Sequence, residues 1–276
     1  MKTRFTNAAS GRLDKLLSEH TKLSRKRAVK TIENGGVRVN GKRAKFASQN
    51  IAAGSAIEVA GATRSAEHPP ISILHQDDML VVADKPFGLP SQATKDGKRT
   101  HLYGLLCAQF PYVGLHHRLD TPASGLVLFT VNRRANKAIA EGFKNHTIGR
   151  HYRAVVVGDP GESGTWTQPI DGRPATTHFQ RIAHNGGLSA ISVTLETGRT
   201  HQIRVHCAAA GHPIVGDRRH GGSAGSLWAR LALHAHTLRF VHPQTNETIT
   251  VESPIPDDLQ DLWRKAVPDE TQPNAD

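Results

Sequence analysis

The stretch HHRLDTPASGLVLFT (His116–Thr130) begins as a polar loop and ends as an apolar run typical of a buried strand. Its one acid, Asp120, lies in the loop just before the strand. A loop fixed by a buried strand can hold a side chain in place and leave it accessible, as a nucleophile or base requires. Alternatively, Asp120 caps the loop or pairs with Arg118, and both interpretations stay open at this point.

Short apolar runs typical of strands recur from residue 71 to residue 240, and two helical segments interrupt them. The runs are ISILH (71–75), MLVVADK (79–85), GLVLFT (125–130), YRAVVVG (152–158), LSAISVTLE (188–196) and LALHAHTLRF (231–240); the helical segments span 132–146 and 199–212. Strands and helices mixed without strict alternation indicate an α+β fold. We therefore predict a central, largely antiparallel mixed β-sheet flanked by helices and loops.

Residues 11–60 show a separate pattern, two helices followed by strands. Leu13, Leu16 and Leu17 recur at helical spacing, and Ser24 is a candidate N-cap for the second helix. The pair Asn40-Gly41 within VRVNGKRA is typical of a β-hairpin turn, and IAAGSAIEVA supplies a further strand. This pattern predicts a small α/β module.

The positive charge of the chain is concentrated in this module. Residues 1–60 contain 13 Lys and Arg against 4 Asp and Glu, a net charge of +9, out of +11 for the whole chain. A concentrated positive field suits a polyanion, because each neutralised phosphate releases counterions. A membrane surface is the weaker alternative, since no lipidation signal or strongly apolar helix face accompanies the charge.

The sequence favours a cytoplasmic protein without membrane contact. It has no run of about 18 apolar residues, and its start lacks the apolar segment of a secretory signal. Two cysteines, Cys107 and Cys207, provide neither a disulfide framework nor a four-ligand zinc pattern, so we interpret them as small buried side chains.

The segment LETGRTHQIRVHCAAAGHPIVGD (195–217) carries the next candidates. Thr200 is a possible N-cap of a helix on which His201 and Arg204 share one face. An arginine on a small, apolar helix needs a carboxylate partner, because an unpaired buried charge is costly. Asp120 is a suitable partner for Arg204.

Two further residues have a structural and a functional interpretation. Asp217 ends the tight turn GHPIVGD, which favours a structural role. Tyr152, in GRHYRAVVVG, alternates with Ala154 on one face of a strand, so its ring should point inward. It is then either a core tyrosine or a ring that stacks on a flat ligand.

The helix, basic helix and G-x-V-x-V-N-G hairpin of the N-terminal module resemble the alpha-L (S4-like) RNA-binding module over about 50 residues. In that family the basic helix and the hairpin face RNA. The resemblance therefore implies RNA contacts by the basic residues Arg25, Lys26, Arg27, Lys30, Arg38 and Lys42. Taken singly, each of these residues could instead be a solvated surface charge.

Four segments of the following domain together resemble the RluA family of RNA pseudouridine synthases. They are HRLDTPASGL (117–126), RHYRAVV (150–156), TGRTHQIRVH with GHPIVGD (197–217) and VVADKPFGLPS (81–91), in a resemblance that runs from about Ile71 to Pro256. Two departures are Ala123, where Thr is common, and His220, where Tyr is common. The resemblance implies a pseudouridine synthase fold.

The resemblance also implies the chemistry. Such an enzyme isomerises a uridine already in RNA, detaching uracil from its ribose, rotating it and rejoining it through carbon. Asp120 would be the nucleophile, on either the ribose anomeric carbon or the uracil ring. Tyr152 would stack on the base and help proton transfer, while Arg204 would pair with Asp120 and align it.

Substrate contacts follow from the same resemblance. Leu233 would form an apolar wall of the base pocket, and Arg118 would enter the RNA and support the flipped-out nucleotide. Arg199 and Lys85 would contact backbone phosphates, and His201 would also contact the RNA substrate. We expect no metal site and no cofactor, because the rearrangement conserves all atoms.

These inferences predict an RNA-binding domain (1–60), a linker (61–70), a catalytic domain (71–265) and a disordered tail (266–276). The expected partner is RNA, ribosomal RNA in preference to transfer RNA, because such a module more often accompanies ribosomal targets. We expect a monomer with no obligate protein partner.

Two other classes of protein share single features with this sequence. A metal hydrolase could use the histidines beside Asp120 or on the Arg204 helix, but their spacing matches neither H-E-x-x-H nor a Cys/His set. A non-catalytic RNA-binding protein would use the N-terminal module alone. The joint presence of Asp120, Tyr152 and Arg204 favours the enzyme over this binder.

Overall fold

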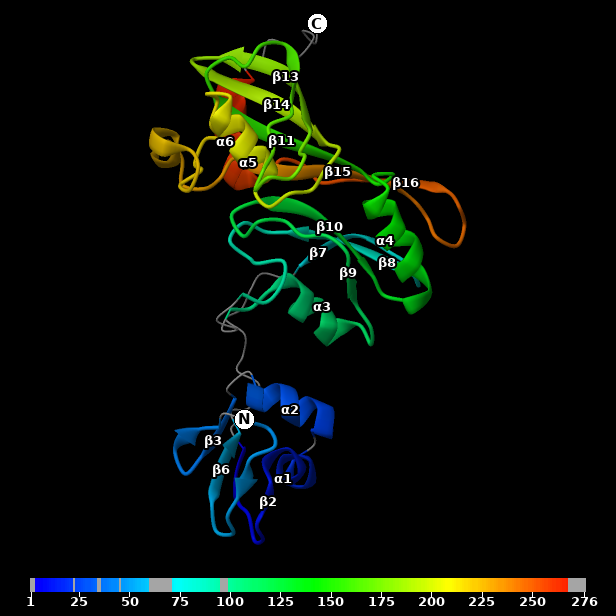
Figure 1. Ribbon diagram of the computed structural model, residues 1–276, viewed down its shortest axis with the longest axis vertical. Coiled ribbons are helices and arrows are strands. Elements are labelled where there is room, and N and C mark those ends of the chain that lie inside the picture. Colours follow the sequence, from blue (N-terminus) through cyan, green and yellow to red (C-terminus); the bar gives the residue numbers. More distant parts are fainter. Residues whose placement is uncertain are drawn as a thin grey trace, which may run out of the picture. The chain divides into compact units, whose positions relative to one another are not determined.

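The computed structural model describes residues 3–21, 23–33, 36–44, 46–59, 71–94 and 99–267. The chain divides into two compact units, Met1–Pro69 with Thr94–Lys98 and Pro70–Ala93 with Arg99–Asp276, and Figure 1 colours them by sequence. The predicted linker (61–70) and residues 268–276 of the predicted tail lie outside the described residues.

The first unit packs two helices against short antiparallel strands. Four strands form a sheet in the order β1-β6-β3-β4, and β2 pairs with β5. The elements are β1 (Thr3–Thr6), β2 (Gly11–Arg12), α1 (Leu13–His20), α2 (Arg25–Glu33), β3 (Val37–Val39), β4 (Lys42–Arg43), β5 (Asn50–Ile51) and β6 (Ala56–Val59). Leu13 and Leu17 of α1 pack with Ala28 and Ile32 of α2 and with Ile57 of β6.

Local sequence signals set the ends of these elements. Ser24 precedes α2, and its Oγ accepts a hydrogen bond from the amide of Arg27 at 3.4 Å. Asn40 and Gly41 join β3 to β4 with positive φ angles of 50° and 76°, the backbone that a two-residue hairpin turn requires. The predicted cap and hairpin are confirmed.

The second unit is built on one mixed sheet, which has ten strands within the described residues. The order is β12-β13-β14-β11-β15-β10-β8-β7, with β16 beside β15 and β9 beside β10. All pairings in the described sheet are antiparallel except the parallel contact between β10 and β15, which confirms the predicted fold class. The strands are β7 (Ser72–Gln76), β8 (Leu80–Lys85), β9 (Gly114–Leu115), β10 (Ser124–Thr130), β11 (Gly149–Val157), β12 (Ser163–Trp166), β13 (Thr177–Asn185), β14 (Leu188–Leu195), β15 (Leu233–Val241) and β16 (Thr248–Glu252).

Helices cover the sheet of the second unit (Figure 1). The two faces of β10 pack against different helices. The helices are α3 (Leu102–Gln109), α4 (Asn136–Lys144), α5 (Gln202–Ala209) and α6 (Asp257–Ala266), with 3-10 turns η1 (Arg133–Ala135) and η2 (Gly222–Ser226). Val127 and Phe129 of β10 join the core that contains α3, whereas Leu126 and Leu128 join the core that contains α4. No helix in the described ranges is long and apolar enough to cross a membrane.

The start of α5 differs from the prediction. The helix begins at Gln202, and the residue before it, His201, has a left-handed φ of 57°. The side-chain oxygen of Gln202 accepts hydrogen bonds from the Thr197 hydroxyl (2.7 Å) and the Arg199 amide (2.9 Å), which turns the chain sharply. Thr200 is therefore outside the cap position, and its prediction as N-cap is wrong.

The loop before β10 is held through its main chain by Lys85, the last residue of β8. The Lys85 ammonium is fully buried and donates hydrogen bonds to the carbonyl oxygens of Leu89 (2.8 Å), Thr121 (3.4 Å) and Ala123. Burial lowers the pKa of Lys85 to about 7, whereas its carbonyl acceptors favour the ammonium form. The carbonyl contacts tie the loop that carries Asp120 to the neighbouring strand.

The parallel contact between β10 and β15 requires a glycine at Gly125. Its φ is 108°, and a Cβ atom there would collide with the backbone of Ala235 in β15. The two strands can therefore approach only where this side chain is absent.

We expect Gly125→Ala to lower the free energy of unfolding by about 4 kcal/mol or more, because a methyl group would force β10 and β15 apart. The control is Gly161→Ala, which shares a positive φ of 88° but has open space around it; it should cost only about 1–2 kcal/mol. Urea unfolding followed by circular dichroism measures both, and equal losses would show that the strand contact tolerates a methyl group.

Candidate functional site

A pocket of about 480 Å³ in the second unit is lined by the loop before β10, by β11 and β15 and by the start of α5. These segments are distant in sequence but meet because β11, β15 and β10 are neighbours in the sheet. Seven residues predicted from the sequence line the pocket: Arg118, Asp120, Tyr152, Arg199, His201, Arg204 and Leu233.

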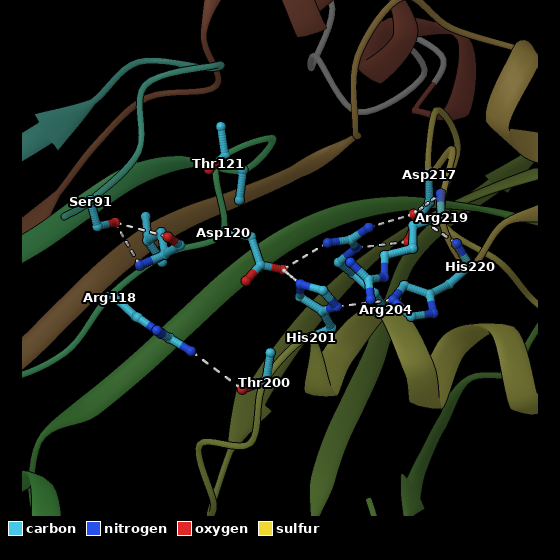
Figure 2. Close-up of polar contacts among 12 residues, drawn as sticks. Ser91, Arg118, Asp120, Thr121, Thr200, His201, Arg204, Asp217, Arg219 and His220 are labelled. Atoms are coloured by element: carbon cyan, nitrogen blue, oxygen red, sulfur yellow. Dashed lines mark hydrogen bonds and ion pairs between the residues drawn. The ribbon is translucent and has the colours of Figure 1, made fainter. Parts of the chain in front are cut away.

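Asp120 is presented to the pocket by a loop that is fixed just before it. The Ser91 hydroxyl donates a hydrogen bond to the carbonyl oxygen of Leu119 at 2.8 Å and accepts one from its amide at 3.0 Å. The Asp120 side chain keeps 22% of its surface exposed. Figure 2 shows it pointing toward Arg204 and His201. The loop thus gives Asp120 a fixed main chain and an accessible carboxylate.

Arg204 contacts two carboxylates from separate loops (Figure 2). Its Nη1 lies 2.9 Å from Asp120 Oδ2, while Nε and Nη2 donate to the two oxygens of Asp217 at 2.9 and 2.7 Å. The Arg204 side chain is only 5% exposed, so both contacts are shielded from water. The predicted pairing of Arg204 with Asp120 is confirmed.

Asp217 holds Arg204 in place, in addition to ending its turn. Burial alone would raise its pKa, but hydrogen bonds from Arg204 and from the amides of His220 and Arg219 lower the pKa overall. An ionised Asp217 fixes the plane of the Arg204 guanidinium by a bidentate contact, so Arg204 can present Nη1 to Asp120. The sequence interpretation missed this contact, although GHPIVGD already placed an acid close behind α5.

Tyr152 and Leu233 form an apolar part of the pocket on adjacent strands β11 and β15. Their exposed fractions are 7% and 5%, and the ring of Tyr152 faces inward as its strand periodicity predicted. Burial raises the pKa of Tyr152, so its hydroxyl stays protonated near neutral pH. A flat group entering the pocket would meet an aromatic ring, an apolar wall and a hydroxyl donor.

Two predicted arginines lie where the pocket meets solvent. Arg118 is exposed, and its Nη2 lies 3.4 Å from the Thr200 hydroxyl. Arg199 is half-buried and donates from Nε to the carbonyl oxygen of Pro174 at 3.0 Å. Neither arginine has a carboxylate partner among the described residues, so both charges are available to a ligand.

His201 forms a histidine pair with His220, which the sequence did not predict. Nδ1 of His201 and Nε2 of His220 are 3.0 Å apart, and Nε2 of His201 is 3.8 Å from Asp120 Oδ2. Burial lowers the pKa of His201, although the nearby Asp120 opposes the shift. Burial and the charge of Arg204 also lower the pKa of His220. Both rings are therefore neutral at pH 7, and one donates a hydrogen bond to the other.

The prediction for Lys85 is wrong. The sequence predicted that it would meet RNA phosphates, but its ammonium is fully buried on carbonyl oxygens of its own chain. No phosphate can reach it in this arrangement. Its contribution is to hold the Asp120 loop.

In the first unit, the predicted basic residues with described side chains, Arg25, Arg27, Arg38 and Lys42, are all exposed. The side chains of Lys26 and Lys30 lie outside the described residues. Asp14, 2% exposed, accepts hydrogen bonds from Arg12 and Arg25 at 3.1 Å. The hydrogen bond from Arg12 is the main cause that lowers the pKa of Asp14 to about 2. Contact of these residues with RNA stays a prediction.

The described ranges contain no group of three or more His, Cys, Asp or Glu side chains arranged to hold a metal ion. Asp120 and its neighbouring histidines, the ligands that a metal hydrolase would use, do not form such a group.

Comparison with known proteins identifies the family of each unit. Residues 79–209 match the model of the RNA pseudouridylate synthase family, and residues 11–57 match that of the S4 domain. Among solved structures, human RNA pseudouridylate synthase domain containing 1 superposes with a TM-score of 0.57 at 27% identity, over 67% of this chain and 83% of that chain.

Curated relatives extend the match over nearly the whole chain. The ribosomal large subunit pseudouridine synthase D of Xanthomonas campestris is 34% identical over 93% of this chain and 89% of the relative. An uncharacterised RNA pseudouridine synthase of Bacillus subtilis is 35% identical over 72% of this chain and 73% of the relative. The chain therefore belongs to the RluA family of RNA pseudouridine synthases, isomerases that convert uridine in RNA to pseudouridine, and it carries an S4 domain at its N-terminal end.

Proposed function

We propose that this protein converts one or more uridines of large-subunit ribosomal RNA to pseudouridine, with Asp120 as the nucleophile. The observation that carries the proposal is the ion pair of Asp120 with the buried Arg204, inside a pocket that also contains Tyr152 and Leu233. The choice of RNA is supported by relatives named for the large ribosomal subunit, which match more than nine-tenths of this chain.

The proposed reaction breaks the bond between uracil N1 and ribose C1′ and forms a bond between C5 and C1′. The proton on C5 is lost and N1 gains one, so uridine and pseudouridine contain the same atoms. The balance requires no redox equivalent and no added group, and for this reason we expect no cofactor.

Only one of the two carboxylate oxygens of Asp120 accepts a hydrogen bond from the described residues. Oδ2 accepts the hydrogen bond from Arg204, whereas Oδ1 accepts none from the described residues. Oδ1 is therefore the atom that attacks, either at C1′ or at C6 of the uracil ring. Arg204 fixes the direction of attack because its own plane is fixed by Asp217.

Tyr152 and Leu233 would hold the base while its bond to ribose is broken. Their side chains enclose an apolar region beside Asp120, where the uracil ring can stack on the phenol. The protonated hydroxyl of Tyr152 is suited to support proton transfer at the sugar. A base stacked within a helix could not reach this pocket, so we propose that the target nucleotide is flipped out, with Arg118 entering the RNA.

The S4 unit would supply affinity rather than chemistry. Residues 1–60 carry a net charge of +9, and the described cationic side chains there are exposed. We keep the proposed division into an RNA-binding domain (1–60) and a catalytic domain (71–265). We also propose that the enzyme acts as a cytoplasmic monomer.

The nucleophile is tested with Asp120→Asn and Asp120→Ala. Both should lower pseudouridine formation by about 10³-fold or more, because no other carboxylate lines the pocket. RNA affinity should stay within a few fold. The assay measures tritium released from C5-labelled uridine in the RNA, and Asp261→Asn, an exposed change on α6, is the control. Normal turnover by the Asp120 variants would overturn the mechanism.

The target is tested by mapping pseudouridines in total RNA of cells that lack this protein. We expect one or more sites in large-subunit ribosomal RNA to lose the modification and to regain it with the wild-type gene. The Asp120→Asn gene should restore none. Loss confined to transfer RNA would contradict the proposed substrate while leaving the enzyme class intact.

Removal of residues 1–60 should weaken RNA binding by about tenfold or more at moderate salt. The slope of log Kd against log salt concentration should also flatten, by roughly 0.7–0.9 for each phosphate contact that is lost. Filter binding over a series of salt concentrations measures both quantities. An unchanged slope would show that the S4 unit makes no ionic contact with the RNA.

A further inference from the structure

Arg150, the second residue of β11, is a buried cation without a carboxylate partner among the described residues. Its exposed fraction is 9%, and it lines the same pocket as Asp120. Its Nε is buried and makes no hydrogen bond, and no carboxylate of the described residues pairs with it. Buried charges are normally paired, because removing an ion from water is costly. An unpaired guanidinium in a binding pocket therefore indicates an anionic ligand.

The charges of the pocket support this interpretation. Its lining contains four arginines, Arg118, Arg150, Arg199 and Arg204, but only one carboxylate, that of Asp120. Arg204 is paired with Asp120 and with Asp217, whereas the other three arginines have no carboxylate partner among the described residues. The pocket thus holds an excess of fixed positive charge, of which Arg150 is the most deeply buried part.

The guanidinium of Arg150 reaches the wall of the pocket. Its Cζ lies 5.8 Å from the centre of the Phe143 ring, and a Cβ atom added at Gly198 would be 3.2 Å from its Nη1. Phe143 and Gly198 both line the pocket. Arg150 and Tyr152 also alternate on the same buried face of β11, so the cation lies beside the proposed base site.

We propose that Arg150 binds one of the two phosphodiester groups that flank the target uridine. The proposal rests on the proposed function and deepens it, since it assigns the group that holds the ribose. While the bond between N1 and C1′ is broken, Tyr152 and Leu233 retain the base and Arg150 retains the sugar. C1′ then stays within reach of C5 after the base has rotated.

A phosphate fits Arg150 better than a uracil oxygen does. The uridine base is neutral when it binds, whereas the phosphodiester is the one permanent charge that the nucleotide brings. The planar guanidinium matches two phosphate oxygens in a bidentate contact. A contact with the base alone would leave the charge of Arg150 uncompensated in the bound state.

The test combines two changes, one on the protein and one on the RNA. The RNA is a synthetic fragment that contains the uridine modified by the wild-type enzyme, with either flanking phosphate replaced by a neutral methylphosphonate. The protein variants are Arg150→Met and Arg150→Lys. The matched control is Arg153→Met, on the opposite face of β11 in the range of Glu252. Single-turnover kinetics give the rate and the half-saturating enzyme concentration.

We expect Arg150→Met and one of the two methylphosphonates each to raise the half-saturating concentration at least about tenfold. Together they should add less than about twofold to either change alone, because both remove the same contact. Arg150→Lys should keep part of the affinity and lose the bidentate contact; it also provides the comparison if Arg150→Met does not fold. Arg153→Met should respond to each RNA as the wild type does.

Additive penalties at both phosphates would overturn the proposal, and so would a loss of rate without loss of affinity, which would place Arg150 on the base. A failure of the proposed function would look different. In that case the wild-type protein would form no pseudouridine even in the unmodified RNA.

Discussion

Arg204 holds two carboxylates that arrive from opposite sides, Asp120 from the loop before β10 and Asp217 from the turn after α5. Arg204 and Asp217 are almost fully buried, so neither charge could remain there without the other. The bidentate contact fixes the guanidinium plane and leaves one nitrogen for Asp120. The docking of α5, the path of the Asp120 loop and the shape of the pocket all depend on this network.

The two units present their positive charge in different physical ways. The S4 unit carries many exposed cationic side chains, which suit contact with several phosphates. The affinity of such contacts depends on salt concentration. The catalytic unit places four arginines around one pocket, and the burial of Arg150 and Arg204 makes their contacts stronger and more directional. Under the proposed function, affinity would come from the first unit, and the second would recognise one nucleotide.

Sequence patterns were sufficient for the parts of the site that depend on local order. The alternation of residues in β11 predicted that Tyr152 points inward. An arginine on a helix of small residues predicted a carboxylate partner, which is Asp120. Other contacts depend on tertiary packing, which no local pattern encodes. Lys85 followed by Pro looks like an exposed loop residue, yet the fold buries it against carbonyl oxygens.

The same limit explains the other differences. Thr200 has the chemistry of an N-cap, but α5 begins at Gln202, so His201 occupies the cap position. The burial of Arg150 without a carboxylate partner depends on β11, α4 and the segment before α5, which meet only in the folded chain. The largely antiparallel sheet could be predicted. The position of the parallel contact at Gly125 could not, because β10 and β15 are far apart in the sequence and no turn motif joins them.

The anchors of the Asp120 loop have a consequence for how this family can diverge. Leu119, Thr121 and Ala123 are all held through main-chain atoms, which every amino acid supplies. The side chains of Leu119 and Ala123 are also buried in the core, whereas that of Thr121 is half-exposed. The place of Asp120 thus depends on main-chain contacts and on core packing, and Thr121 is the anchor whose side chain can change with the least effect on it.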